Sequence, residues 1–84
     1  MYINISKDII IKLDDIIGIF DIEGNNKKDY LNSIIERLNE KKSIIDISDG
    51  NPKSLILYKK AGNERGILSN ISSYSLGKKK KIIN

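Results

Sequence analysis

The stretch that decides the fold is Tyr2–Ile22, YINISKDIIIKLDDIIGIFDI. Its isoleucines come in short clusters, which two polar breaks separate, at Ser6-Lys7-Asp8 and at Leu13-Asp14-Asp15. β-Branched clusters of this length, with turn-forming residues between them, are typical of strands. The pattern predicts three short strands joined by two tight turns, which begin a sheet.

The spacing of apolar residues changes further along the chain. Leu31, Ile34, Ile35 and Leu38 recur at the period of one face of a helix, and the side chain of Asn26 is suited to cap its first turn. The spacing predicts a helix from Lys27 to about Lys42, which the packing of this apolar stripe holds in place.

Strand patterns return after the helix. The following segments are expected: strands at Ser43–Ile47, Lys53–Tyr58 and Arg65–Ile71, a turn at Ser48–Pro52, and a hairpin loop at Lys59–Glu64. Ser72–Leu76 either forms one helical turn or stays irregular. The order β-β-β-α-β-β-β predicts an α+β fold, with a mixed, mostly antiparallel sheet of about six short strands and one long helix on a face. Residues 1–76 are expected to form a single domain, and residues 77–84 a basic, mobile tail.

The composition excludes several classes of function. With no Cys and no His, the chain has no thiolate ligand, no disulfide and no imidazole general base. We therefore expect no enzyme, no cofactor, no metal site and no small-molecule substrate. No apolar run is long enough to cross a membrane, and the N-terminus lacks the pattern of a signal peptide, so a cytoplasmic protein without membrane contact is expected.

The net charge of +4 is unevenly distributed. Four of the 15 basic residues form one run, Lys78-Lys79-Lys80-Lys81, and 11 acidic residues balance the other 11. The run could attract phosphates without regard to sequence, or it could be a solvated chain end.

Acidic residues offer little chemistry. Asp14-Asp15 is the one adjacent carboxylate pair, and its position between two strands indicates a solvated turn. Asp46 and Asp49 flank a turn but lack the regular oxygen ligands and closing Glu of a calcium loop.

Basic and hydroxyl side chains near the later turns are candidates for DNA contacts. Lys53 and Ser54 could donate to a phosphate, although a structural entry into the following strand is the favoured interpretation. Lys59, Lys60 and Arg65 surround the last hairpin, where they could form a basic ribbon for a DNA groove or protect a sheet edge from aggregation. Both interpretations stay open.

Three motifs together resemble a known family: MYIN at the N-terminus, DIIGIFD from Asp15 to Asp21, and NPKSLIL from Asn51 to Leu57. The chain resembles the extracellular-matrix regulatory proteins, the RemA/RemB family, and within it the RemB-like branch. The resemblance implies a cytoplasmic DNA-binding regulator of biofilm-matrix genes, a protomer similar to the LytTR type of DNA-binding domain, and assembly into a homo-oligomeric ring.

The resemblance also implies where DNA contacts lie in the RemA branch, which places arginines in the turn after the second strand and in the later glycine-containing turn. Asp15, Asn51 and Pro52 occupy those positions here, and Lys53 keeps a positive charge beside them. Two functions follow as hypotheses. The first is a ring-forming DNA-binding regulator that uses Lys53, Ser54, Lys59, Lys60, Arg65 and Lys78–Lys81. The second is a homo-oligomeric interaction module without DNA affinity.

Overall fold

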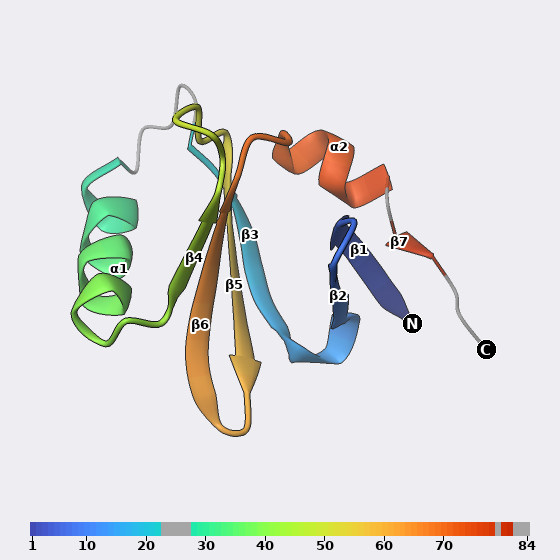
Figure 1. Ribbon diagram of the computed structural model, residues 1–84, viewed down its shortest axis with the longest axis horizontal. Coiled ribbons are helices and arrows are strands. Elements are labelled where there is room, and N and C mark those ends of the chain that lie inside the picture. Colours follow the sequence, from blue (N-terminus) through green and yellow to red (C-terminus); the bar gives the residue numbers. More distant parts are fainter. Residues whose placement is uncertain (23–27, 79, 82–84) are drawn as a thin grey trace.

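The computed structural model describes residues 1–22, 28–78 and 80–81 (Figure 1). The elements follow in this order: β1 (Tyr2–Ser6), β2 (Ile9–Lys12), the 3-10 turn η1 (Leu13–Asp15), β3 (Ile16–Asp21), α1 (Lys28–Glu40), β4 (Ile44–Ile47), β5 (Ser54–Lys60), β6 (Asn63–Ser69), α2 (Ser73–Lys78) and β7 (Lys80–Lys81). The predicted α+β class, the three opening strands and the single long helix are confirmed. The predicted cap residue, Asn26, lies outside the described residues.

The strands form two sheets, where the sequence led us to expect one. β2, β1 and β7 make a three-stranded sheet, and β3, β5, β6 and β4 make a four-stranded sheet in that order. The η1 turn separates β2 from β3, so that β3 pairs with β5 instead of continuing the first sheet. Of the pairings described, β4 with β6 is parallel and the others are antiparallel, which agrees with the expected mixed sheet.

The last hairpin is tighter than predicted. Lys59 pairs with Glu64 and Lys60 with Asn63, so these residues belong to the strands and not to a loop. The turn is Ala61-Gly62, and both residues have positive φ, 53° and 81°. Two successive positive φ values give the turn the twist that an antiparallel ladder needs, which lets β5 and β6 pair to their ends.

The C-terminal part of the chain is more regular than predicted. Ser72–Leu76 resolves into the start of α2, where the Ser75 amide donates to the Ser72 hydroxyl at 3.1 Å, as at a capped helix start. Lys80–Lys81 pairs with β1 as β7. The expected mobile tail of residues 77–84 therefore includes the end of α2 and a short strand, while residues 79 and 82–84 lie outside the described part.

Two apolar clusters lie on opposite faces of the four-stranded sheet. Along β5, Leu55 and Leu57 point to one face and Ile56 and Tyr58 to the other, as alternation in a strand requires. The first pair packs against Leu31, Ile34 and Leu38 of α1. The second pair packs against residues of β1, β2, β6 and α2, namely Ile3, Ile5, Ile11, Ile67 and Leu76.

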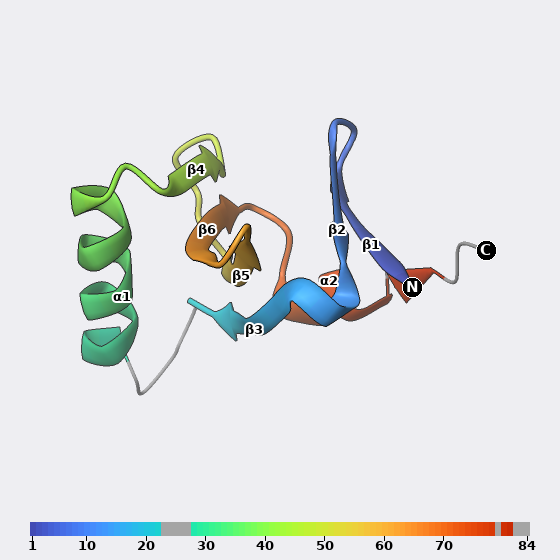
Figure 2. The same cartoon turned by 90° about the horizontal axis from the view of Figure 1, so that it is seen from below.

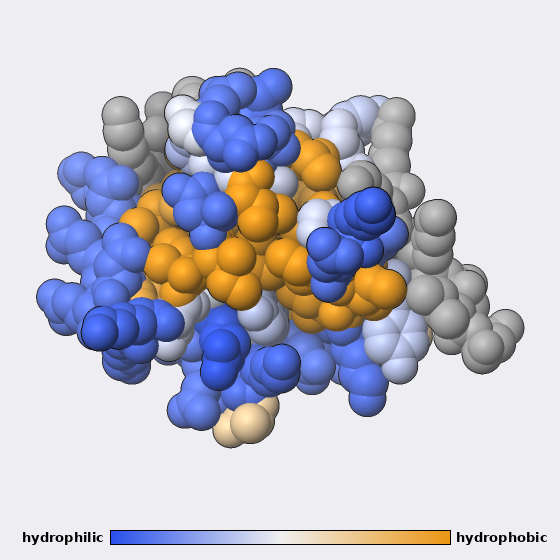
Figure 3. All heavy atoms as spheres, in the orientation of Figure 1, coloured by the Kyte–Doolittle hydropathy of each residue, from blue (hydrophilic) through white to orange (hydrophobic). Residues whose placement is uncertain are grey.

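The two faces of this sheet are covered unequally. In Figure 2, α1 lies along one face, while the β1–β2 hairpin stands beside the other face at some distance from β4. Apolar side chains are visible on the surface in this region, across the middle of the view in Figure 3. Exposed isoleucines include Ile45 of β4, at 44% exposure, and Ile10 of β2, at 58%. One face of the sheet is therefore open on its β4 side.

Candidate functional site

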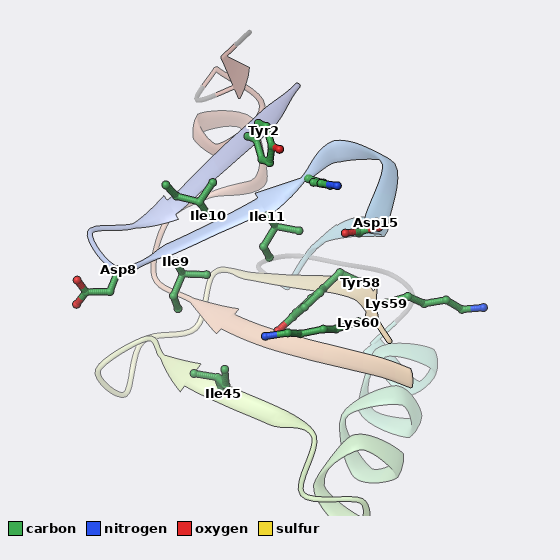
Figure 4. A pocket seen from close by; sticks show the side chains of 11 residues that line it. Tyr2, Asp8, Ile9, Ile10, Ile11, Asp15, Ile45, Tyr58, Lys59 and Lys60 are labelled. Atoms are coloured by element: carbon green, nitrogen blue, oxygen red, sulfur yellow. The ribbon is translucent and has the colours of Figure 1, made fainter. Parts of the chain in front are cut away.

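A groove of about 400 Å³ lies on the open side of the sheet. Its apolar walls come from Ile9, Ile10 and Ile11 of β2, Ile45 of β4 and Tyr58 of β5. Figure 4 shows Ile9 and Ile11 directed from β2 toward the sheet, and Ile45 directed from β4 toward the same space. The groove thus separates two strands that each form the outer edge of a sheet, β2 and β4.

The rim of the groove carries charges of both signs. Lys12, Lys59 and Lys60 line it together with Asp8 and Asp15. Lys59 and Lys60 are sequence-predicted candidates, and the structure brings Lys12 of the other sheet to the same rim. Lys12 was not among the residues predicted from sequence, because strand spacing does not indicate which strands of different sheets meet.

Lys59 and Lys60 point in different directions because neighbours in a strand face opposite sides. Lys60 lies two residues after Tyr58, and Figure 4 shows both side chains directed to the groove side of β5 while Lys59 points away. Lys59 pairs with Glu64, whose carboxylate receives a hydrogen bond from Arg37 of α1 at 3.0 Å. Of this pair, Lys60 is the cation that overhangs the apolar surface.

Arg65 lies directly opposite Tyr58 in the β5–β6 ladder and therefore on the groove face. Its side chain is half-buried, and its Nε atom is buried with no hydrogen-bond partner among the described residues. A buried donor without a partner carries a desolvation cost, so this part of the Arg65 side chain lowers the stability of the fold.

Lys53 belongs to the other end of the sheet. Its amide donates to the Ser69 carbonyl at 2.8 Å, and its carbonyl accepts from the Ile22 amide at 2.9 Å, so its backbone is fixed just before β5. At the rise of an extended strand, Lys53 and Lys60 are roughly 20 Å apart. The basic candidates therefore form two separate places, one at each end of β5.

Ser54 does not present its hydroxyl to solvent. The residue is fully buried, and its Oγ atom donates to the Ile71 carbonyl at 2.7 Å. The buried Ser69 completes the arrangement, since its Oγ atom accepts from the Ile71 amide at 3.0 Å. The proposed phosphate contact by Ser54 is corrected here: the hydroxyl fixes the chain between β6 and α2, and structural entry into the strand is its observed role.

The acidic candidates behave as turn residues. Asp14 and Asp15 are exposed in η1. The Asp46 carboxylate accepts from the Ser48 hydroxyl at 2.6 Å and the Ser48 amide at 2.9 Å, and these hydrogen bonds lower the pKa of Asp46 below its ordinary value. Within residues 1–22, 28–78 and 80–81, no group of three or more acidic side chains is placed to hold a metal ion.

The basic run at the C-terminus is divided by the fold. Lys78 is the last residue of α2. Lys80 and Lys81 form β7, and their backbone pairs with β1. Lys79 lies outside the described residues. In the described part of the chain, no helix is long and apolar enough to cross a membrane.

These features define a small α+β domain with a half-open sheet, an apolar groove and a rim of mixed charge. The chain belongs to the RemA-like family, because the family model described as extracellular matrix regulatory protein A-like matches residues 2–79. The family resemblance inferred from the three motifs is thereby confirmed, while the RemB-like branch and the LytTR likeness stay predictions. A comparison with curated proteins gives no match.

Proposed function

We propose that this chain is a non-enzymatic, DNA-binding regulator of extracellular-matrix genes that acts in the cytoplasm as a homo-oligomeric ring. The family match supports the regulatory role, since it covers residues 2–79 and its description is that of a matrix regulatory protein. The ring and the DNA contacts are the properties that the family resemblance, carried by the three sequence motifs, implies.

The placement of Lys12 and Lys60 at the same groove is the observation that supports the DNA contact. Both are exposed, and they line the groove from two different sheets, whereas Lys59 points to the other face of β5. Sequence-independent contacts to a phosphate backbone need positive charge and donors on one surface, which these ammonium groups supply. Asp15 on the same rim weakens the attraction, so the proposed contact is with phosphates and of moderate strength.

A charge-matched pair of double variants tests which end of the sheet binds DNA. Lys12→Gln with Lys60→Gln removes two cations from the groove rim, and Lys7→Gln with Lys53→Gln removes two from elsewhere. The measurement is the titration of a labelled duplex at several salt concentrations. We expect the first double variant to flatten the log–log salt slope by about 2, because each phosphate contact contributes about 0.9, and the second to leave it nearly unchanged.

Two results would overturn this assignment. No binding of the wild type at low salt would refute DNA binding altogether. Equal losses in both double variants would show a response to net charge, without a contact surface at the rim.

An interaction module without DNA affinity is the second candidate. It is favoured by the groove itself, which has apolar walls and both Asp8 and Asp15 on its rim. Apolar surface suits a protein partner better than a polyanion. A wild type that forms oligomers but leaves the duplex free at low salt would identify this function.

A further inference from the structure

Both outer strands of the four-stranded sheet expose an isoleucine. β3 and β4 lie at opposite ends of the strand order β3-β5-β6-β4. Ile17 of β3 is 49% exposed and Ile45 of β4 is 44% exposed. Ile17 does not line the groove, whereas Ile45 forms part of its wall. The two residues therefore mark two different apolar surfaces on one chain.

These outer strands have little protection against pairing with another chain. β4 reads Ile44-Ile45-Asp46-Ile47, and its one charged side chain is bound to Ser48. β3 reads Ile16-Ile17-Gly18-Ile19-Phe20-Asp21 and carries no Lys and no Pro. Soluble monomers commonly protect outer strands with Lys, Pro or a covering element. Both strands have the composition of edges that a partner covers.

We propose that the groove beside β4 receives the β3 edge of a second copy of this chain, with Ile17 of one copy packed against Ile45 of the next. This inference rests on the proposed homo-oligomer and assigns its contact surfaces. A concave groove cannot fill itself by meeting an identical groove, so the contact joins two different surfaces. Head-to-tail contacts of this kind generate a closed ring when the rotation between subunits permits.

The apolar character of the two surfaces favours a second copy over a nucleic acid. The walls of the groove are isoleucine and tyrosine, which do not attract a polyanion. The β3 edge of another copy offers a matching apolar side chain, because Ile17 is 49% exposed.

Complementation between two charge variants tests the proposal. Ile45→Lys places an ammonium group in the groove, and Ile17→Lys places one on the β3 edge. Each variant alone should be a monomer by light scattering at micromolar concentration. An equimolar mixture should form a dimer, because the Ile17→Lys chain keeps an intact groove and the Ile45→Lys chain keeps an intact β3 edge. Tyr30→Lys is the matched control, since Tyr30 of α1 is 58% exposed and lies outside both surfaces.

Both isoleucines are substantially exposed, so the variants should retain the wild-type circular dichroism spectrum and unfolding midpoint. Folded Ile45→Lys with the mass of the wild-type oligomer would overturn the inference and leave the proposed ring standing. A folded mixture that stays monomeric would overturn the pairing of these two surfaces. A wild type that is monomeric at micromolar concentration would refute both the inference and the proposed ring.

Discussion

The Ser54 hydroxyl is buried and donates to the Ile71 carbonyl, so it matters for stability and not for DNA contact. Ser54→Ala leaves that carbonyl without its donor. We expect the free energy of unfolding to fall by about 1–3 kcal/mol, the usual cost of an unsatisfied buried group. Denaturant unfolding measures the loss.

Ser33→Ala is the control for this substitution. The Ser33 hydroxyl also donates to a backbone carbonyl, that of Asp29 at 3.0 Å, but it does so on the exposed side of α1. Its loss should change stability by less than about 0.5 kcal/mol. DNA affinity per folded molecule should be the same for Ser54→Ala and the wild type. A selective loss of DNA affinity in Ser54→Ala would restore the phosphate contact predicted from sequence.

The packing of α1 on the sheet depends on the absence of a side chain at Gly66 of β6. A Cβ atom at this position would lie 2.6 Å from Leu38 Cδ1 and 3.3 Å from Leu55 Cδ1. Leu38 and Leu55 are both fully buried, so neither can move away freely. We expect Gly66→Ala to destabilise the domain by about 1–3 kcal/mol through overpacking, as measured by thermal unfolding.

Gly77→Ala provides the comparison for Gly66→Ala. Gly77 lies in α2, and a Cβ atom there meets nothing within 4 Å. Alanine is favoured over glycine inside a helix by roughly 0.5–1 kcal/mol, so this variant should be as stable as the wild type or slightly more so. A Gly66→Ala protein as stable as Gly77→Ala would contradict the close approach of α1 to β6.

Elements with strong local patterns were predictable from sequence. The stripe of Leu31, Ile34 and Leu38 predicted α1, and the isoleucine clusters predicted β1, β2 and β3, because apolar spacing reports directly on local geometry. The division into two sheets was not predictable, since it depends on whether η1 lets β3 continue beside β2 or turn toward β5. The extra pairs of the last hairpin were also missed, because Lys59 and Lys60 look like loop residues until Ala61-Gly62 is known to form the turn.

The candidate site depends on contacts between elements that are distant in sequence. Lys59 and Lys60 were correctly predicted to be neighbours at one hairpin. Lys12 lines the same groove only because β2, in the other sheet, lies across that groove from β5. Lys53 was predicted at the turn that precedes this strand, and it lies at the opposite end of β5 from Lys60. The groove was not predicted at all, since its two sides, Ile9–Ile11 and Ile45, come from strands whose packing no local pattern encodes.

One variant, Ile45→Lys, tests assembly and DNA binding together, because its added charge and its loss of assembly change duplex affinity in opposite directions. The new lysine adds a positive charge beside the rim, so a protein that binds DNA as a monomer should bind slightly more tightly. A ring binds through several subunits at once, and such multivalency raises apparent affinity by factors of about 10² or more. We therefore expect Ile45→Lys to lose at least tenfold in duplex affinity at fixed salt, whereas Tyr30→Lys, with the same added charge, should lose none. Unchanged or tighter binding by a monomeric Ile45→Lys protein would show that a single subunit carries the full DNA affinity.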